Sequence, residues 1–267
     1  MSPCSPTSNS ADAVGGHLPD AWRLAVGTLT AVPVRAPGRV DRDTAGLAMV
    51  LAPLAVLPLG VAVALVLWGG RELGLSPLAL GLVAVGTLAL GSRAFHLDGL
   101  ADTADGLTAS YDRERSLEVM KSGAAGPAGV AALVVVLGIQ AVGLGGFAYA
   151  DRGPVLALVL VCASRVALTI TCARGVPAAR PEGLGASHAG SVPRPVVVAV
   201  WLAAGAISAA TLSWAGGTWW HVVIGFVVAA VAVGLIVLRA TRRLGGVTGD
   251  FFGAAIEITL AILLLSA

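Results

Sequence analysis

The stretch "WWHVVIGFVVAAVAVGLIVL", residues 219–238, decides the fold, because its 20 residues include no acidic or basic side chain apart from one histidine. A helix of about 20 apolar residues spans the hydrocarbon core of a bilayer, whereas a surface helix of a soluble domain carries a polar face. The rest of the chain has the same character, with 57% hydrophobic and only 12% charged residues. These values lie outside the range of soluble domains, so we expect a membrane protein.

Similar apolar runs occur along the whole chain, and we count about seven, the last one short. They lie near 45–68, 77–91, 129–150, 154–173, 195–214, 219–238 and 253–267. No polar segment is long enough for a soluble domain of its own. The sequence therefore predicts an all-α, polytopic helical bundle that forms a single membrane domain over residues 21–267. Residues 1–20 are rich in Ser, Pro, Gly and Ala and are predicted to be a disordered tail.

The placement of lysine and arginine predicts the orientation. If seven helices alternate and the N-terminus is cytoplasmic, fourteen basic side chains fall on the cytoplasmic side and only Arg71 and Arg152 on the other, with Arg165 inside a span. Such a bias is typical of cytoplasmic loops. We therefore expect a multi-pass protein of the cell membrane whose aspartate-rich segment and loops 174–194 and 239–252 face the cytoplasm.

The aspartate-rich segment is "FHLDGLADTADGL", residues 95–107. Asp98, Asp102 and Asp105 are spaced i, i+4, i+7, so they share one face of a helix. Three neighbouring carboxylates next to lipid repel one another unless a cation neutralises them. Oxygen ligands without a nearby cysteine favour Mg²⁺ or Mn²⁺ over zinc. The alternative is a solvated helix end, but the apolar residues interleaved with the aspartates argue against it.

Several motifs together resemble one known family. They are "GTLTAVPV", "FHLDGLADTADGL", "LEVMKSGAAGPAG", a later "SR", "ARPEGLG" and "GGVTGDFFGAAIE", in this order from about residue 27 to the end. This set is similar to the cobalamin synthase family, the adenosylcobinamide-GDP ribazoletransferases. The resemblance implies a Mg²⁺-dependent enzyme of cobalamin biosynthesis at the cytoplasmic face of the membrane. It would join adenosylcobinamide-GDP to α-ribazole or α-ribazole 5′-phosphate and release GMP.

The candidate site follows from these motifs. Asp98, Asp102 and Asp105 are candidate metal ligands and catalytic residues, and Asp250 is the fourth carboxylate expected at the metal. Arg165 is a candidate catalytic residue, because an arginine inside a span needs an anionic partner; a structural pair with Glu257 is the alternative. The candidate substrate-binding residues lie in the motifs and in the basic loops beside them: His96, Lys121, Ser164, Arg174, Thr248 and Gly249.

Two other functions fit parts of the sequence less well. A CDP-alcohol phosphotransferase also uses aspartates in the membrane, but Asp105-Gly106 is not followed by the remainder of that motif. A transporter would suit glycine-rich spans, yet the charged motifs gather on one side rather than at the midplane. Besides its two substrates, we expect the lipid bilayer as a partner and no nucleic acid. A homo-oligomer remains an open alternative.

Overall fold

The computed structural model describes residues 10–267, and over this range it is built from helices without extended strands. The first half contains α1 (Ser10–Leu29), α2 (Arg42–Ala55), α3 (Leu57–Glu72), α4 (Pro77–Gly91), α5 (Phe95–Ala109), α6 (Arg113–Val119) and α7 (Pro127–Ala148). The second half contains α8 (Gly153–Ala163), a 3₁₀ turn η1 (Ser164–Val166), α9 (Ala167–Thr171), α10 (Leu184–His188), α11 (Arg194–Trp214), α12 (Trp219–Leu244) and α13 (Asp250–Ser266). The all-α helical membrane fold is thereby confirmed.

Residues 10–267 contain five or six candidate membrane spans, compared with the seven or so that the sequence predicts. Within residues 10–267, five segments are long and apolar enough to cross a bilayer: Arg42–Glu72, Pro127–Ala148, Gly153–Thr171, Arg194–Trp214 and Trp219–Leu244. Helices α4 and α5 form a sixth candidate only if a pair bent by 93° counts as one span. The predicted last span corresponds to α13, which has 17 residues, most of them buried by other helices. Composition alone does not separate a helix that faces lipid from one enclosed by protein.

The structure describes only part of the predicted tail. Residues 1–9 lie outside the described residues, whereas residues 10–20 form the first half of α1. Asp20 explains part of this order, because its carboxylate accepts hydrogen bonds from the backbone amides of Gly38 and Arg39 at 2.9 and 3.1 Å. The segment after α1 is thus tied back to the helix.

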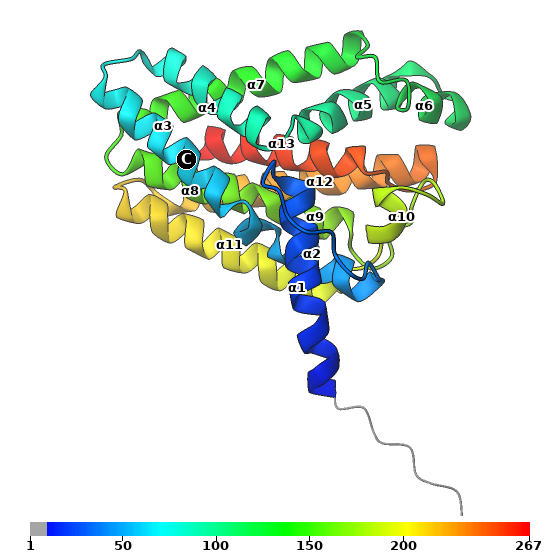
Figure 1. Ribbon diagram of the computed structural model, residues 1–267. Helices are drawn as coiled ribbons and strands as arrows, with labels where there is room; N and C mark the ends of the chain where they lie inside the picture. The colour runs from blue at the N-terminus through cyan, green and yellow to red at the C-terminus, as the bar shows by residue number, and fades with distance from the viewer. Residues whose placement is uncertain (1–9) are drawn as a thin grey trace, which may run out of the picture.

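The sharp turn between α4 and α5 brings the acidic helix into the bundle (Figure 1). Arg93 and Ala94 both adopt left-handed backbone angles, with φ of 56° and 57°, which stop α4 and redirect the chain. Such non-glycine residues are strained and persist only where their surroundings hold them. The Arg93 guanidinium donates to the carbonyl of Gly27, and the amide of Ala31 donates to the carbonyl of Gly91. The end of α1 therefore holds the turn in place.

Two glycines allow α5 to cross α13 in direct backbone contact. A Cβ atom on Gly99 would lie 2.6 Å from the carbonyl oxygen of Asp250, and one on Gly253 would lie 2.7 Å from that of His96. Any larger residue at these positions would force the helices apart. Helix α13 runs through the middle of the bundle, so this crossing fixes α5 against its centre (Figure 1).

The loops at one end of the bundle are joined by arginine side chains (Figure 1). Arg113, at the start of α6, donates to the carbonyls of Leu244 and Ala179 at 2.9 and 2.8 Å. Arg180 donates to the carbonyl of Leu117 at 2.6 Å. The segments after α5, after α9 and after α12 therefore meet at this end. The distribution of basic residues predicted that these loops lie on the same side.

The loops of the opposite end are joined separately. The hydroxyl of Tyr149 donates to the carbonyl of Leu75 at 2.6 Å, and the guanidinium of Arg152 stacks on the ring of Trp214 at 4.3 Å. The connections α3–α4, α7–α8 and α11–α12 thus meet here, far from α6 and α10 (Figure 1). The two basic residues that the sequence set apart, Arg71 and Arg152, belong to this end.

Candidate active site

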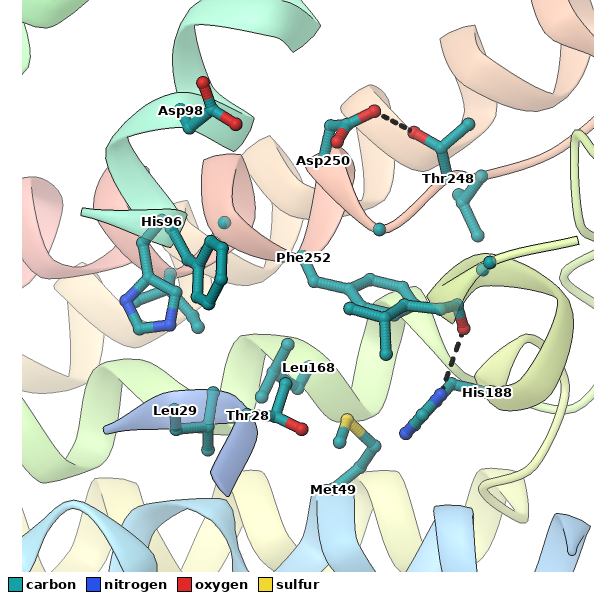
Figure 2. A pocket seen from close by; sticks show the side chains of 18 of the residues that line it. Thr28, Leu29, Met49, His96, Asp98, Leu168, His188, Thr248, Asp250 and Phe252 are labelled. Carbon is teal, nitrogen blue, oxygen red and sulfur yellow. Dashed lines mark hydrogen bonds between the residues drawn. The ribbon is translucent and has the colours of Figure 1, made fainter. Parts of the chain in front are cut away.

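A cavity of about 490 Å³ opens between α1, α2, α5, α10 and the start of α13, at the end where the basic loops meet. Asp98 and Asp250 lie on one side of it, and Leu29, Met49 and His188 lie on the other (Figure 2). Of the residues predicted from the sequence, the cavity is lined by His96, Asp98, Thr248, Gly249 and Asp250.

Asp98 and Asp250 form the acidic side of the cavity. Asp98 is exposed on α5, one residue before the glycine that contacts the backbone of Asp250. The hydroxyl of Thr248 donates to Oδ2 of Asp250 at 2.7 Å and so orients this carboxylate. Burial raises the pKa of Asp250, while the bond from Thr248 and the charge of Arg180 lower it and the charge of Asp98 raises it. A cation bound beside Asp250 would favour its ionised form.

Asp102 and Asp105 have different surroundings, although they share a helix face with Asp98. Asp102 is 7% exposed and lies among the charges of Asp98, Asp250 and Asp105, with Arg180 as the opposing charge. Asp105 faces α7 instead, and its carboxylate accepts the amides of Gly126 and Gly129 at 2.6 and 2.9 Å. It therefore caps the N-terminus of α7, where a negative charge is favourable.

The donor chemistry of the acidic side fits magnesium. Asp98, Asp102 and Asp250 offer carboxylate oxygens and Thr248 a hydroxyl oxygen, and Mg²⁺ is typically held by one or two carboxylates together with substrate phosphates. Within residues 10–267, no three His, Cys, Asp or Glu side chains already stand close enough to enclose a metal by themselves. A site completed by substrate oxygens agrees with both observations.

Arg165 and Ser164 lie inside the bundle, and neither lines the cavity. The Arg165 side chain is 1% exposed and donates to the carbonyl of Val161 and to the hydroxyl of Ser164, both at 2.8 Å. The acidic side chain whose charge acts on Arg165 is Glu257 on α13. This position agrees with the structural alternative for Arg165 and brings it into no contact with the aspartates.

Glu257 belongs to a buried polar cluster beneath the cavity. Its Oε2 accepts a hydrogen bond from Nε2 of Gln140 at 2.7 Å, and its Oε1 lies 3.7 Å from Nδ1 of His96. His96 is 5% exposed and reaches the cavity wall from this cluster (Figure 2). His96 therefore links the acidic helix to the centre of α13.

Lys121 and Arg174 are exposed at the basic end but do not line the cavity. The structure instead adds residues that the sequence did not single out, among them Thr28, Met49, Arg180, Glu182 and His188. Thr28, Arg180 and Glu182 lie within the quoted motifs "GTLTAVPV" and "ARPEGLG". Their position within these motifs could have identified these three residues, whereas no motif in the sequence includes Met49 or His188.

The fold and the cavity define a polytopic helical membrane protein with an acidic site at one end of its bundle. The chain belongs to the cobalamin-5-phosphate synthase family, whose model matches residues 21–267.

Curated relatives extend this match over nearly the whole chain. An adenosylcobinamide-GDP ribazoletransferase of Nocardioides sp. is 56% identical over 247 residues, which cover 92% of this chain and 97% of the relative. Proteins of the same name from Frankia casuarinae and Bradyrhizobium diazoefficiens are each 37% identical, over 91% and 92% of this chain and 92% of each relative. No solved structure matches the chain. The family that the motifs indicated is thereby confirmed.

Proposed function

We infer that this chain catalyses the ribazoletransferase reaction of its relatives. It transfers the cobinamide phosphate group of adenosylcobinamide-GDP to a ribose hydroxyl of α-ribazole or of its 5′-phosphate, and it releases GMP. The full-length match to ribazoletransferases supports this inference. The observation that carries it is the meeting of Asp98 and Asp250, which come from two separate family motifs, on one side of a single cavity (Figure 2).

Magnesium is the cofactor that we propose for this site. Asp98 and Asp250 would hold it, and Asp102 lies near enough for the charges of both to act on its carboxyl group. When bound, the ion neutralises negative charge on the phosphoryl oxygens, which is the main requirement of phosphoryl transfer.

The residues of the chain supply binding and orientation. The Arg180 guanidinium lies in the cavity wall and can neutralise a second part of the diphosphate. The start of α13 follows Gly249, so its free amides favour anionic oxygens at the same place. In the reaction, the ribose oxygen forms a bond to the phosphorus that carries cobinamide, and the bond from that phosphorus to the GMP oxygen breaks. The hydroxyl proton passes to an acceptor on the acidic side.

We propose that the site end of the bundle faces the cytoplasm of the cell membrane. Most of the basic side chains belong to this end, and cytoplasmic loops are enriched in Lys and Arg. A single cysteine at Tyr111, in a background without native cysteines, should react with an impermeant reagent only from the cytoplasmic side. A cysteine at Gly216 should react only from outside, and the opposite pattern would reverse this orientation.

A release assay tests the proposed activity. Membranes that contain the protein should release GMP from adenosylcobinamide-GDP only when α-ribazole or its phosphate is added. Asp98→Asn should abolish this release, whereas the matched control Asp151→Asn, an exposed aspartate at the other end, should not. Release without the ribazole acceptor, or equal rates for both variants, would contradict the proposal.

A further inference from the structure

The cavity has an inner chamber that differs from its acidic side. This chamber lies away from Asp98 and Asp250, deep between α1, α2 and α13 (Figure 2). Apart from Thr28 and His188, its walls are apolar and at most 7% exposed, and they come from Leu29, Met49, Leu168, Phe252 and Ile256. An apolar chamber of this kind suits a ligand with an apolar body.

His188 places one polar atom in this apolar wall. The ring is 1% exposed, and its Nδ1 lies 2.7 Å from the hydroxyl oxygen of Ser187 and 3.0 Å from the carbonyl oxygen of Leu184. These two groups occupy Nδ1 and leave Nε2 as the free nitrogen of the ring. Nε2 is buried and has no hydrogen-bond partner in the described chain. Figure 2 shows the ring directed toward Met49, across the chamber.

The ring of His188 is held neutral by its surroundings. Burial lowers the pKa of His188 more than the bond to Leu184 raises it. The charged groups around it are Arg42, which reaches the adjacent turn through the carbonyl of Ala189, and Arg180, Glu182, Asp98 and Asp250 in the cavity wall. A neutral imidazole with a free Nε2 can form a hydrogen bond with a hydroxyl group, because a hydroxyl both donates and accepts.

We propose that the inner chamber binds the acceptor nucleoside, with its apolar aromatic base against Met49 and Phe252 and a ribose hydroxyl hydrogen-bonded to Nε2 of His188. This assignment rests on the proposed ribazoletransferase function. The base of α-ribazole is a dimethylated benzimidazole, which has no hydrogen-bond donor and two methyl groups, so an apolar wall desolvates it at little cost.

The other parts of the two substrates fit the chamber less well. Guanine has several donors and acceptors on its edge, and a wall of Leu, Met, Phe and Ile would leave them unpaired. A corrin with its amide side chains is larger than a cavity of about 490 Å³, which suits a ligand the size of a nucleoside. The cobinamide group therefore remains outside the chamber, and its diphosphate lies at the acidic side.

The test separates the two substrates kinetically. His188→Gln should raise KM for α-ribazole by roughly tenfold, the effect of one lost hydrogen bond, and leave KM for adenosylcobinamide-GDP unchanged. The matched control is His221→Gln, an exposed histidine at the other end of the bundle, which should change neither constant. Binding of α-ribazole alone, measured as a rise in the melting temperature of the purified protein, should weaken in His188→Gln only.

A second variant tests the apolar wall without relying on His188. Met49→Ala should reduce the preference for α-ribazole over the nucleoside of unmethylated benzimidazole by about tenfold or more in kcat/KM, because the methyl groups lose their contact. Met120→Ala is the control, since Met120 is equally buried but lies outside the cavity.

The outcomes separate the inference from the function on which it rests. If the parent protein does not release GMP in response to α-ribazole, the proposed function fails. If the parent is active but these variants raise KM for adenosylcobinamide-GDP instead, the chamber holds the guanosine or cobinamide side and the inference is overturned. Unchanged constants and an unchanged base preference in both variants would overturn it as well.

Discussion

The contact between α5 and α13 at Gly99 and Gly253 leads to a prediction about activity. A Cβ atom added at Gly253 would lie 2.7 Å from the carbonyl oxygen of His96, whereas ordinary contact begins at 3.4 Å, so the helices must separate by about 0.7 Å. At Gly99 the corresponding separation is about 0.8 Å, from 2.6 Å to the carbonyl oxygen of Asp250. Asp98 and Asp250 lie on the two helices that move.

A displacement near 1 Å in a catalytic site reduces turnover by up to about 100-fold, so we expect Gly253→Ala to lower kcat by one to two orders of magnitude. Overpacking of this kind destabilises a protein by roughly 1–3 kcal/mol, which leaves much of it folded. The assay is GMP release by the purified protein, with its melting temperature measured in parallel.

Gly138→Ala is the matched control, because Gly138 lies in a membrane helix and a Cβ atom there meets nothing within 4 Å. The control should retain the activity and the melting temperature of the parent. If Gly253→Ala were as active as Gly138→Ala while equally well folded, the close crossing would not set the geometry of the site, and this reasoning would be wrong.

Three further substitutions distinguish roles within the acidic and buried clusters. Asp250→Asn should lower kcat by about 100-fold or more at normal membrane levels and raise the Mg²⁺ concentration needed for half-maximal rate; a normal Mg²⁺ titration would exclude it as a ligand. Asp105→Asn should instead lower stability by roughly 1.5–3 kcal/mol, through its bonds to Gly126 and Gly129, with little change in the Mg²⁺ requirement. Arg165→Lys should keep activity within about twofold of the parent, because Arg165 contacts none of the aspartates and donates to Val161 and Ser164; loss of most turnover in a variant that inserts and folds normally would contradict this structural role.

The sequence predicted well what depends on local composition. The apolar runs indicated a helical membrane protein, and all seven of them are helical in the structure. The distribution of basic residues predicted which loops meet at one end of the bundle. The seven or so predicted spans compare with five or six candidate spans in residues 10–267, and α13, the last of the seven, has only 17 residues and is surrounded by protein, with Phe251 and Ile256 fully buried.

The surroundings of individual acids depend on neighbours that helical spacing does not specify. Asp98 and Asp105 share a face of α5, but α5 lies between α13 and α7, so one carboxylate reaches the cavity and the other reaches the amides that begin α7. His188 could not be found from spacing either. Its place in the cavity wall depends on α1, α2, α10 and α13, which enclose the cavity only in the folded chain.

The buried polar cluster explains how Asp250 keeps its orientation. Asp250 and Glu257 are seven residues apart on α13, and at about 100° per residue they lie on nearly the same face. A rotation of α13 that turned Asp250 away from the cavity would therefore remove Glu257 from Gln140. An unpaired acid inside a membrane bundle costs several kcal/mol, so such rotations are disfavoured. The hydrogen bond between Glu257 and Gln140 therefore fixes the rotation of α13 against α7, while Gly99 and Gly253 fix α5 against α13.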